Sequence, residues 1–277
     1  MLIYCNGDSF VAGVELGDTV LTDYPGTFDY DYIPDHAREW IANTYKPNHP
    51  YSIERDNRQK ELIELEYQRA FPNKIKELLN VPVVNHGMGG SSMDRIVRTS
   101  ITALIELKKE HDNIIAIIGD TDCNRSEIPN FEYLEYEDAS GFNRHWLCMS
   151  SNYHMSNRKP AEPLIEYKLR YEKNYHGMVN YYKNVLLLQD FCAKNNITLY
   201  WLQSHSRNII EPEPEYANDP CFNNFKEYVD FKYTISMTEI GQEIYHKVRC
   251  PSGHYSENVH EEVANRLVNI IKENHNV

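Results

Sequence analysis

Three short polar turns, each following an apolar run, carry the side chains that could do chemistry. The first holds Asp8 and Ser9, the second Gly89 and Gly90, and the third Thr121. A serine hydroxyl can act as a nucleophile when a neighbouring base takes its proton. The alternative for Ser9 is a serine that ends a strand and hydrogen-bonds its own turn, and Asp8 is expected to brace that turn through backbone N–H groups.

Four apolar runs predict the strands that must position these turns, at residues 2–5, 81–85, 114–118 and 197–202. Helical spacing of apolar residues predicts helices over 59–80 with a bend near Pro72, through about 110, over 165–195 and over 256–274. Ser91 or Ser92 is expected to cap the second helix, and Ser256 the last.

This alternation of strand and helix predicts a three-layer α/β/α fold, flavodoxin-like, with a mostly parallel central sheet. The carboxyl ends of parallel strands share one edge of the sheet, where ligands bind, so the three turns should converge there. We expect a single domain over 1–277, with insertions at about 18–58, 123–165 and 204–250 that frame the crevice.

Composition restricts the class of partner. The 277 residues include 28 Lys+Arg and 41 Asp+Glu, a formal net charge of -13, which disfavours nucleic acid and anionic lipid. No apolar run is long enough to span a bilayer, and the N-terminus has no signal-peptide pattern, so a cytoplasmic protein without a membrane partner is expected. Oligomeric state is not readable from the sequence.

The cysteines and histidines show no metal-binding spacing. The six cysteines are far apart and are expected to be buried thiols, and the 12 histidines include no His-Glu-x-x-His pair. We therefore predict no metal. The 21 tyrosines could form a platform for sugar rings, although packing of long loops onto the core is the favoured explanation.

The turns, together with a C-terminal segment, resemble the motifs of the SGNH or GDSL hydrolase family. Gly7-Asp8-Ser9-Phe10 is similar to its nucleophile motif, with Phe10 in place of the usual leucine. Residues 85–90, Asn-His-Gly-Met-Gly-Gly, are similar to the second motif, and residues 252–260 to the segment that leads into the last helix. The motifs occur in the family's order from one end of the chain to the other.

This resemblance implies roles for four residues and no cofactor. Ser9 is the nucleophile, His254 the general base, and the N–H of Gly90 an oxyanion donor. Thr121 stands where the family has an oxyanion-binding asparagine, and Asn124 could reach in instead. The alternatives are a loop histidine at 254, a glycine kept at 90 for positive φ, and a structural threonine at 121.

A second departure concerns the carboxylate of the catalytic triad. Ser252 and Pro251 stand two and three residues before His254, where the family has an aspartate, and neither can stabilise an imidazolium as a carboxylate does. A backbone carbonyl, or a carboxylate from an inserted loop, could orient His254. His260 is expected inside the last helix, and His205 in a loop.

The resemblance thus implies a serine esterase or deacetylase that acts on a small-molecule or carbohydrate ester, such as an O-acetyl group on a carbohydrate. The chain also resembles a subset found in bacteriophage genomes, through Ile118-Gly119-Asp120-Thr121 and Arg125, which raises virion association as an option. The main alternative is a binding or structural protein that keeps the architecture without efficient catalysis. A nucleotide-binding flavodoxin-like protein is weaker, since residues 87–92 lack a P-loop lysine and the Gly-x-Gly-x-x-Gly spacing.

Overall fold

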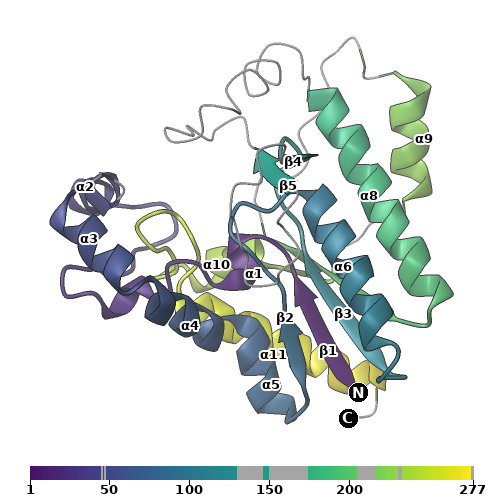
Figure 1. The fold of residues 1–277 in the computed structure, drawn as a ribbon, viewed down its shortest axis with the longest axis horizontal. Coiled ribbons are helices and arrows are strands. Elements are labelled where there is room, and N and C mark those ends of the chain that lie inside the picture. The colour runs from purple at the N-terminus through teal and green to yellow at the C-terminus, as the bar shows by residue number, and fades with distance from the viewer. Residues whose placement is uncertain are drawn as a thin grey trace.

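Five parallel strands form the central sheet of the computed structural model, in the order β2-β1-β3-β6-β7 (Figure 1). The structure describes residues 1–44, 46, 48–129, 146–149, 174–204, 216, 218–229 and 233–275. The sheet strands are β1 (Leu2–Asn6), β2 (Val83–Asn85), β3 (Ile114–Gly119), β6 (Thr198–Gln203) and β7 (Ile235–Ser236). This confirms the predicted three-layer α/β fold with a parallel sheet.

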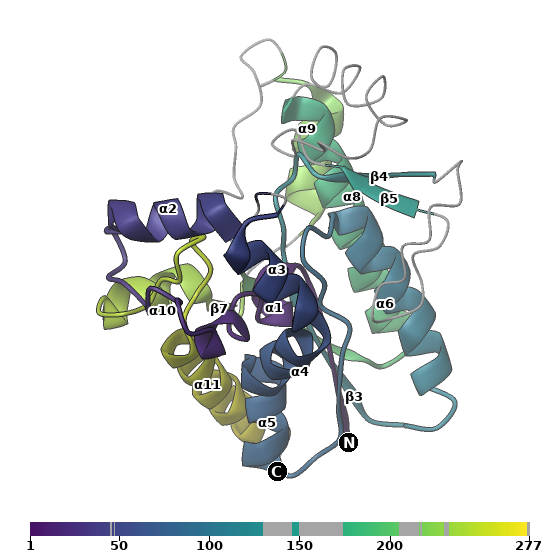
Figure 2. The same cartoon turned by 60° about the vertical axis from the view of Figure 1, so that its left-hand side comes forward.

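Helices cover both faces of the sheet, which explains why β1 and β3 read as continuous apolar runs. One face packs against α6 (Met93–Leu107) and α8 (Asn174–Lys194), with α9 (Pro220–Tyr228) beside α8. The other packs against α5 (Phe71–Leu79), α10 (Met237–Ile244) and α11 (Glu257–His275). Figure 2 shows these two helical layers on opposite sides of β3.

Residues along β1 alternate between the two cores. Leu2 and Tyr4 belong to the core under α6 and α8, whereas Ile3 and Cys5 belong to the core under α5 and α11. All four are 2% exposed or less. Because both faces are apolar, the strand is fixed in the interior of the sheet, between β2 and β3, and its carboxyl end has one position.

The segment between β1 and β2 is more helical than the sequence predicts. The short helix α1 (Ser9–Ala12) is followed by the 3-10 helix η1 (Asp18–Val20), and then by α2 (Asp35–Thr44), α3 (Pro50–Asn57) and α4 (Gln59–Arg69). The predicted helix over 59–80 divides at Ala70, whose extended backbone separates α4 from α5. Pro72, in the first turn of α5, lacks the N–H that a continuous helix would need there.

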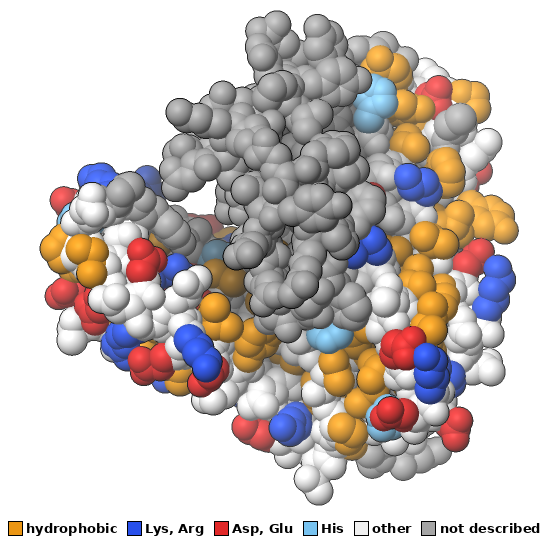
Figure 3. All heavy atoms as spheres, viewed as in Figure 1, with side chains coloured by type: hydrophobic (Ala, Val, Ile, Leu, Met, Phe, Trp, Pro, Cys, Tyr) orange, Lys and Arg blue, Asp and Glu red, His pale blue; other side chains and the backbone are white. Residues whose placement is uncertain are grey.

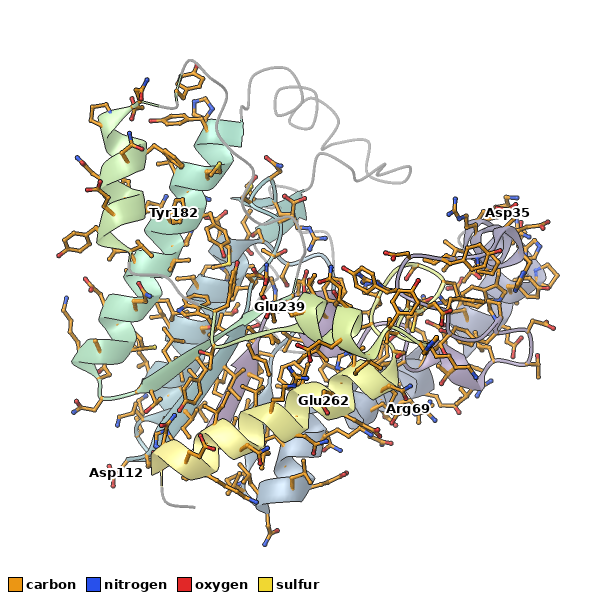
Figure 4. The ribbon with its side chains drawn as sticks, turned by 180° about the vertical axis from the view of Figure 1, so that it is seen from behind. Asp35, Arg69, Asp112, Tyr182, Glu239 and Glu262 are labelled. Carbon is orange, nitrogen blue, oxygen red and sulfur yellow. The ribbon has the colours of Figure 1, made fainter. Side chains whose placement is uncertain are left out.

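These helices have a small core of their own. Leu21, Trp40 and Leu62 are buried together, which holds α2 and α4 to the chain that follows η1. In Figure 1, α2, α3 and α4 lie to the left of the sheet. Figure 4 shows, from behind, Asp35 at the outer end of this group and Arg69 where α4 meets α11. Arg69 Nη1 lies 4.0 Å from Glu257 Oε2 of α11.

The other two predicted insertions are described only in part. The first contains the antiparallel hairpin of β4 (Ser126–Pro129) and β5 (Trp146–Met149), and residues 130–145 and 150–173 lie outside the described residues. The second contains α9, β7 and α10. Strand β7 was not predicted, because a strand of two residues is too short to show a period.

One of the two predicted helix caps is observed. Ser92 caps α6, with its Oγ accepting from the N–H of Arg95 at 3.2 Å, and Asp94 lies in the first turn as expected. The prediction for Ser256 is wrong, because its buried Oγ makes no hydrogen bond with any residue that the structure describes. Its backbone carbonyl accepts from Val259 N at 3.1 Å instead.

The predicted buried thiols are confirmed for the four cysteines that can be assessed, Cys5, Cys123, Cys192 and Cys250, which are also free. In the described part of the chain, no helix combines the length and apolar character needed to cross a bilayer. On the face seen in Figure 3, the coloured Lys and Arg side chains are interspersed with Asp and Glu rather than gathered into one patch.

The contact between α4 and the turn before η1 depends on Gly17. A Cβ at residue 17 would lie 2.2 Å from the carbonyl oxygen of Leu62, and the backbone there is ordinary right-handed helix. We expect Gly17→Ala to lower the free energy of unfolding by about 1–3 kcal/mol, because two backbones must separate. Urea denaturation measures this.

Gly89→Ala is the matched control, because a Cβ at residue 89 would meet its nearest neighbour at an ordinary 3.4 Å. Its unfolding free energy should stay within about 0.5 kcal/mol of wild type. Equal denaturation midpoints for the two variants would show that the space between residue 17 and α4 can accommodate a Cβ.

Candidate active site

The carboxyl end of β1 presents Ser9 as the first residue of α1. Asp8 is the N-cap of that helix, and its Oδ1 accepts from the N–H of Phe10 at 3.0 Å, so it braces the turn as predicted. Gly7 is required by space, since a Cβ there would lie 2.3 Å from Val11 Cγ2. Ser9 itself is 6% exposed.

The second turn lies beside Ser9. The N–H of His86 donates to the carbonyl of Cys5 at 2.8 Å, and that of Met88 to the carbonyl of Gly7 at 3.1 Å, so the chain after β2 follows the end of β1. A Cβ at Gly89 would lie 3.9 Å from the Cβ of Ser9. The predicted convergence of the first two turns is therefore observed.

Gly90 adopts a left-handed backbone conformation, with φ of +76°, which favours glycine. Neither its N–H nor the N–H of Ser9 donates a hydrogen bond to any of the residues that the structure describes. Such N–H groups are the donors that an oxyanion needs.

Thr121 reaches the same cluster but its hydroxyl is already engaged. Its Oγ1 donates to the carbonyl of Ser91 at 2.8 Å and accepts from Arg125 Nη1 at 2.8 Å. A hydroxyl has one proton to donate, so Thr121 as the fold holds it ties the third turn to the second. The side chain of Asn124 lies against α8, where a Cβ at Gly177 would be 3.3 Å from Asn124 Oδ1.

Arg125 joins these turns to the first. Its Nη1 lies 3.1 Å from Oδ2 of the fully buried Asp8. This ion pair compensates a carboxylate that has no access to water and fixes the turn that carries Ser9.

His254 lies at the end of a tight turn that leads into α11. The N–H of Cys250 donates to its carbonyl at 2.8 Å, and Arg249 Nη1 donates to the carbonyl of Gly253 at 2.7 Å. The imidazole packs on the ring of Phe10, with the centroids 5.3 Å apart. No hydrogen bond joins His254 to Ser9, so the fold brings the histidine to the residue next to Ser9 rather than onto its hydroxyl.

The residue that the sequence analysis missed is Glu15. Its Oε2 lies 3.2 Å from Nδ1 of His254, and the side chain is 3% exposed. Ser252, in the position of the family's aspartate, contributes a hydroxyl 2.7 Å from the same Nδ1, and that hydroxyl also contacts Glu15. A signal was present, because Glu15 is the only charged residue in the apolar stretch 10–16.

The backbone of Glu15 is unfavourable for a glutamate. Its φ is +77°, in the left-handed region, which costs a residue other than glycine about 1–3 kcal/mol. Its N–H donates to Oε1 of Glu66 on α4 at 2.8 Å. The surrounding structure therefore fixes a conformation that the chain would not adopt alone.

Two other carboxylates lie near Glu15. Burial raises the pKa of Glu66 to about 7, although its hydrogen bond from the Glu15 backbone opposes the shift. Burial also raises the pKa of Asp18, against the effect of Arg55, whose Nε lies 2.9 Å from Asp18 Oδ1. Within the described ranges, no group of three or more His, Cys, Asp or Glu side chains could hold a metal ion.

Two further histidines named in the sequence analysis are His260 and His205. His260 lies within α11 as expected and is 1% exposed, and its Nδ1 accepts from the N–H of Phe71 at 3.2 Å. Burial lowers its pKa to about 3, so it stays neutral. His205 lies outside the described residues.

No protein-family model and no curated protein matches the sequence. Among solved structures, the chain is similar to a lipolytic protein of the G-D-S-L family from Desulfitobacterium hafniense DCB-2, at 9% identity and a TM-score of 0.42, over 97% of this chain and 98% of that one. It is also similar to a carbohydrate esterase, at 13% identity and a TM-score of 0.41, over 99% of this chain and 69% of that one.

A third similar structure is an acetyl xylan esterase from the rumen bacterium Butyrivibrio proteoclasticus. The identity is 15% and the TM-score 0.39, and the match covers 98% of this chain and 63% of that one. At this level of similarity the chemistry of the site has to be judged from its own residues.

His260 gives a test of the packing behind the site. Its pKa is about 3 in the folded chain against an ordinary 6.5, so the unfolded chain binds the extra proton between these values. The stability that this residue contributes is present above pH 6.5 and is lost as pH falls towards 3, by up to about 1.4 kcal/mol per pH unit. In His260→Gln, urea denaturation from pH 7 to 4.5 should show a shallower loss.

His246→Gln is the control, since the side chain of His246 is 79% exposed. It should keep the slope of the wild type. If wild type and His260→Gln lose stability in parallel, His260 is not buried as a neutral acceptor.

The chain therefore has the three-layer α/β fold that its resemblance to the SGNH/GDSL hydrolases predicts, with a parallel sheet and the motif turns together at one edge of it.

Proposed function

We propose that the chain is a serine-dependent esterase in which Ser9 is the nucleophile and His254 the general base. The observation that carries the proposal is the position of His254, whose ring packs on Phe10 while a buried carboxylate faces its Nδ1. This arrangement leaves the other ring nitrogen, Nε2, to serve the neighbouring Ser9.

The reaction proceeds through an acyl-enzyme. Nε2 of His254 takes the proton of Ser9 as Oγ forms a bond to the ester carbonyl carbon. Collapse of the tetrahedral intermediate breaks the ester C–O bond, and His254 returns the proton to the departing alcohol. Water then attacks the acyl group, His254 takes a proton from it and passes it to Ser9 Oγ as the acyl bond breaks, and the carboxylic acid leaves.

The oxyanion is held by backbone donors in this proposal. The N–H groups of Ser9 and Gly90 supply two hydrogen bonds where the negative charge develops. The family position of the third donor is Thr121, whose hydroxyl donates to the Ser91 carbonyl. We therefore assign Thr121 to bracing the two turns, and expect a slower enzyme than one with three donors, since a single donor is worth about 3–4 kcal/mol.

The substrate is an acyl ester. The resemblance of the motifs suggests an O-acetyl group on a carbohydrate as the first class to test, with short-chain aryl acetates as general probes. The chemistry uses no cofactor, because the proton transfers and the nucleophile all come from side chains.

A binding protein that has lost efficient catalysis is the second candidate. Two observations favour it: the engaged hydroxyl of Thr121 and the absence of a hydrogen bond between Ser9 and His254. Catalytic hydrogen bonds often tighten only when substrate is bound, so the second observation is compatible with both functions.

A fluorophosphonate probe separates the two. Wild type should be labelled, because the probe needs a serine whose proton is removed by a base, and Ser9→Ala should not. Thr102→Ala, which removes an exposed hydroxyl on α6, is the matched control and should be labelled like wild type. Mass spectrometry of the labelled peptide measures the result. Folded wild type that takes no label would favour the binding protein.

A further inference from the structure

The segment that follows α1 carries a buried carboxylate to the imidazole of His254. Glu15 is six residues after Ser9 in the chain, and its Oε2 lies 3.2 Å from His254 Nδ1. Both oxygens of Glu15 accept from the N–H of Ser252, at 3.1 and 3.3 Å. The carboxylate thus contacts the histidine turn through three separate groups: a backbone N–H, a hydroxyl and a ring nitrogen.

Ser252 lies between the other two side chains. Its Oγ is 2.7 Å from Nδ1 of His254 and contacts Oε2 of Glu15. A carboxylate can only accept, so the hydroxyl donates to Glu15 and its lone pair faces the histidine. His254 must then carry its proton on Nδ1 to satisfy both neighbours. The neutral ring leaves Nε2 without a proton, which is the form that a general base needs.

Helices α3 and α4 fix the carboxylate from the other side. Glu66 of α4 holds the N–H of Glu15 in its left-handed conformation. Arg69 Nη1 donates to the carbonyl of Leu16 at 3.3 Å. Arg55 of α3 pairs with Asp18, three residues further on. Residues on both sides of Glu15 are therefore held, which sets the direction of its side chain.

Resting on the esterase function above, we propose that Glu15 is the positioning carboxylate of this site, and that it replaces the aspartate that the motif lacks before His254. It acts through His254 and touches no reacting atom. Ser252 transmits the same constraint through its hydroxyl, which contacts both Glu15 and His254.

The charged and titratable groups around His254 support this assignment. They are Glu15, Asp18 and Glu66 on the side of α3 and α4, Arg55 beyond Asp18, Arg249 and Cys250 in the turn before His254, Tyr24 near Cys250, and the neutral His260 of α11. Arg55 compensates the charge of Asp18, and Glu66 accepts a hydrogen bond from the N–H of Glu15. Glu15 is the carboxylate that the structure leaves to face the imidazole.

The first test uses the wild-type protein and needs no activity. Nitrogen-15 NMR of the histidine rings distinguishes the two neutral tautomers. At pH values where His254 is neutral, its proton should reside on Nδ1. A proton on Nε2 would overturn the proposal, because Nδ1 could then not donate to Glu15 or Ser252.

The second test compares Glu15→Gln with Glu61→Gln, a matched loss of an exposed glutamate on α4. In Glu15→Gln, kcat on an aryl acetate should fall about 100- to 10,000-fold with little change in KM, since the ring loses its orienting charge. Glu61→Gln should match wild type in both.

Glu15→Asp completes the set, because it keeps the charge on a shorter side chain and should recover part of the lost kcat. A merely structural Glu15 would lower the unfolding midpoint but leave kcat of the folded protein within about threefold of wild type, and this result overturns the proposal. Failure of the esterase function gives a different pattern: wild type takes no fluorophosphonate, while the Nδ1–H tautomer of His254 is still observed.

Discussion

The contact between Glu15 and the turn of His254 is the constraint on which the site depends, because it joins two segments 239 residues apart in the chain. The sheet alone brings the first two turns together, since both leave neighbouring parallel strands at the same edge. The turn that carries His254 follows the helix α10 and not a strand, so the sheet alone does not place it. It precedes α11, on one face of the sheet. Its place beside the first turn depends on packing against Phe10 and on the contacts that His254 and Ser252 make with Glu15.

Burial gives this contact a definite electrostatic character. Three carboxyl groups, from Glu15, Asp18 and Glu66, lie in one poorly solvated region with Arg55 paired to one of them. Desolvation disfavours the charged form of a carboxyl, and the raised pKa of Glu66, about 7, reflects that cost. In the proposed mechanism, the imidazolium of His254 forms at the edge of this acidic region.

The parts of the fold and site that the sequence could predict are those encoded locally. The strands β1, β2, β3 and β6 are visible as apolar runs, and Ser9, Gly90 and His254 each lie in a motif whose spacing survives without the structure. Glu15 was missed because its role depends on a left-handed backbone and on a distant partner, neither of which leaves a periodic pattern. The sequence left Thr121 open between an oxyanion donor and a structural threonine, because the Ser91 carbonyl that engages its hydroxyl belongs to a different turn.

Helix α4 lies against the backbone on both sides of Glu15. It approaches the chain after α1 so closely that a Cβ at Gly13 would lie 2.7 Å from the carbonyl oxygen of Glu66, and one at Gly17 would lie 2.2 Å from that of Leu62. These two glycines bracket Glu15. Backbone contact on both sides of a residue determines its φ and ψ more firmly than side-chain packing can, because backbone atoms have no rotamers to adjust. The position of the carboxylate, and through it the proposed orientation of His254, is thus set by a helix that lies outside the sequence motifs.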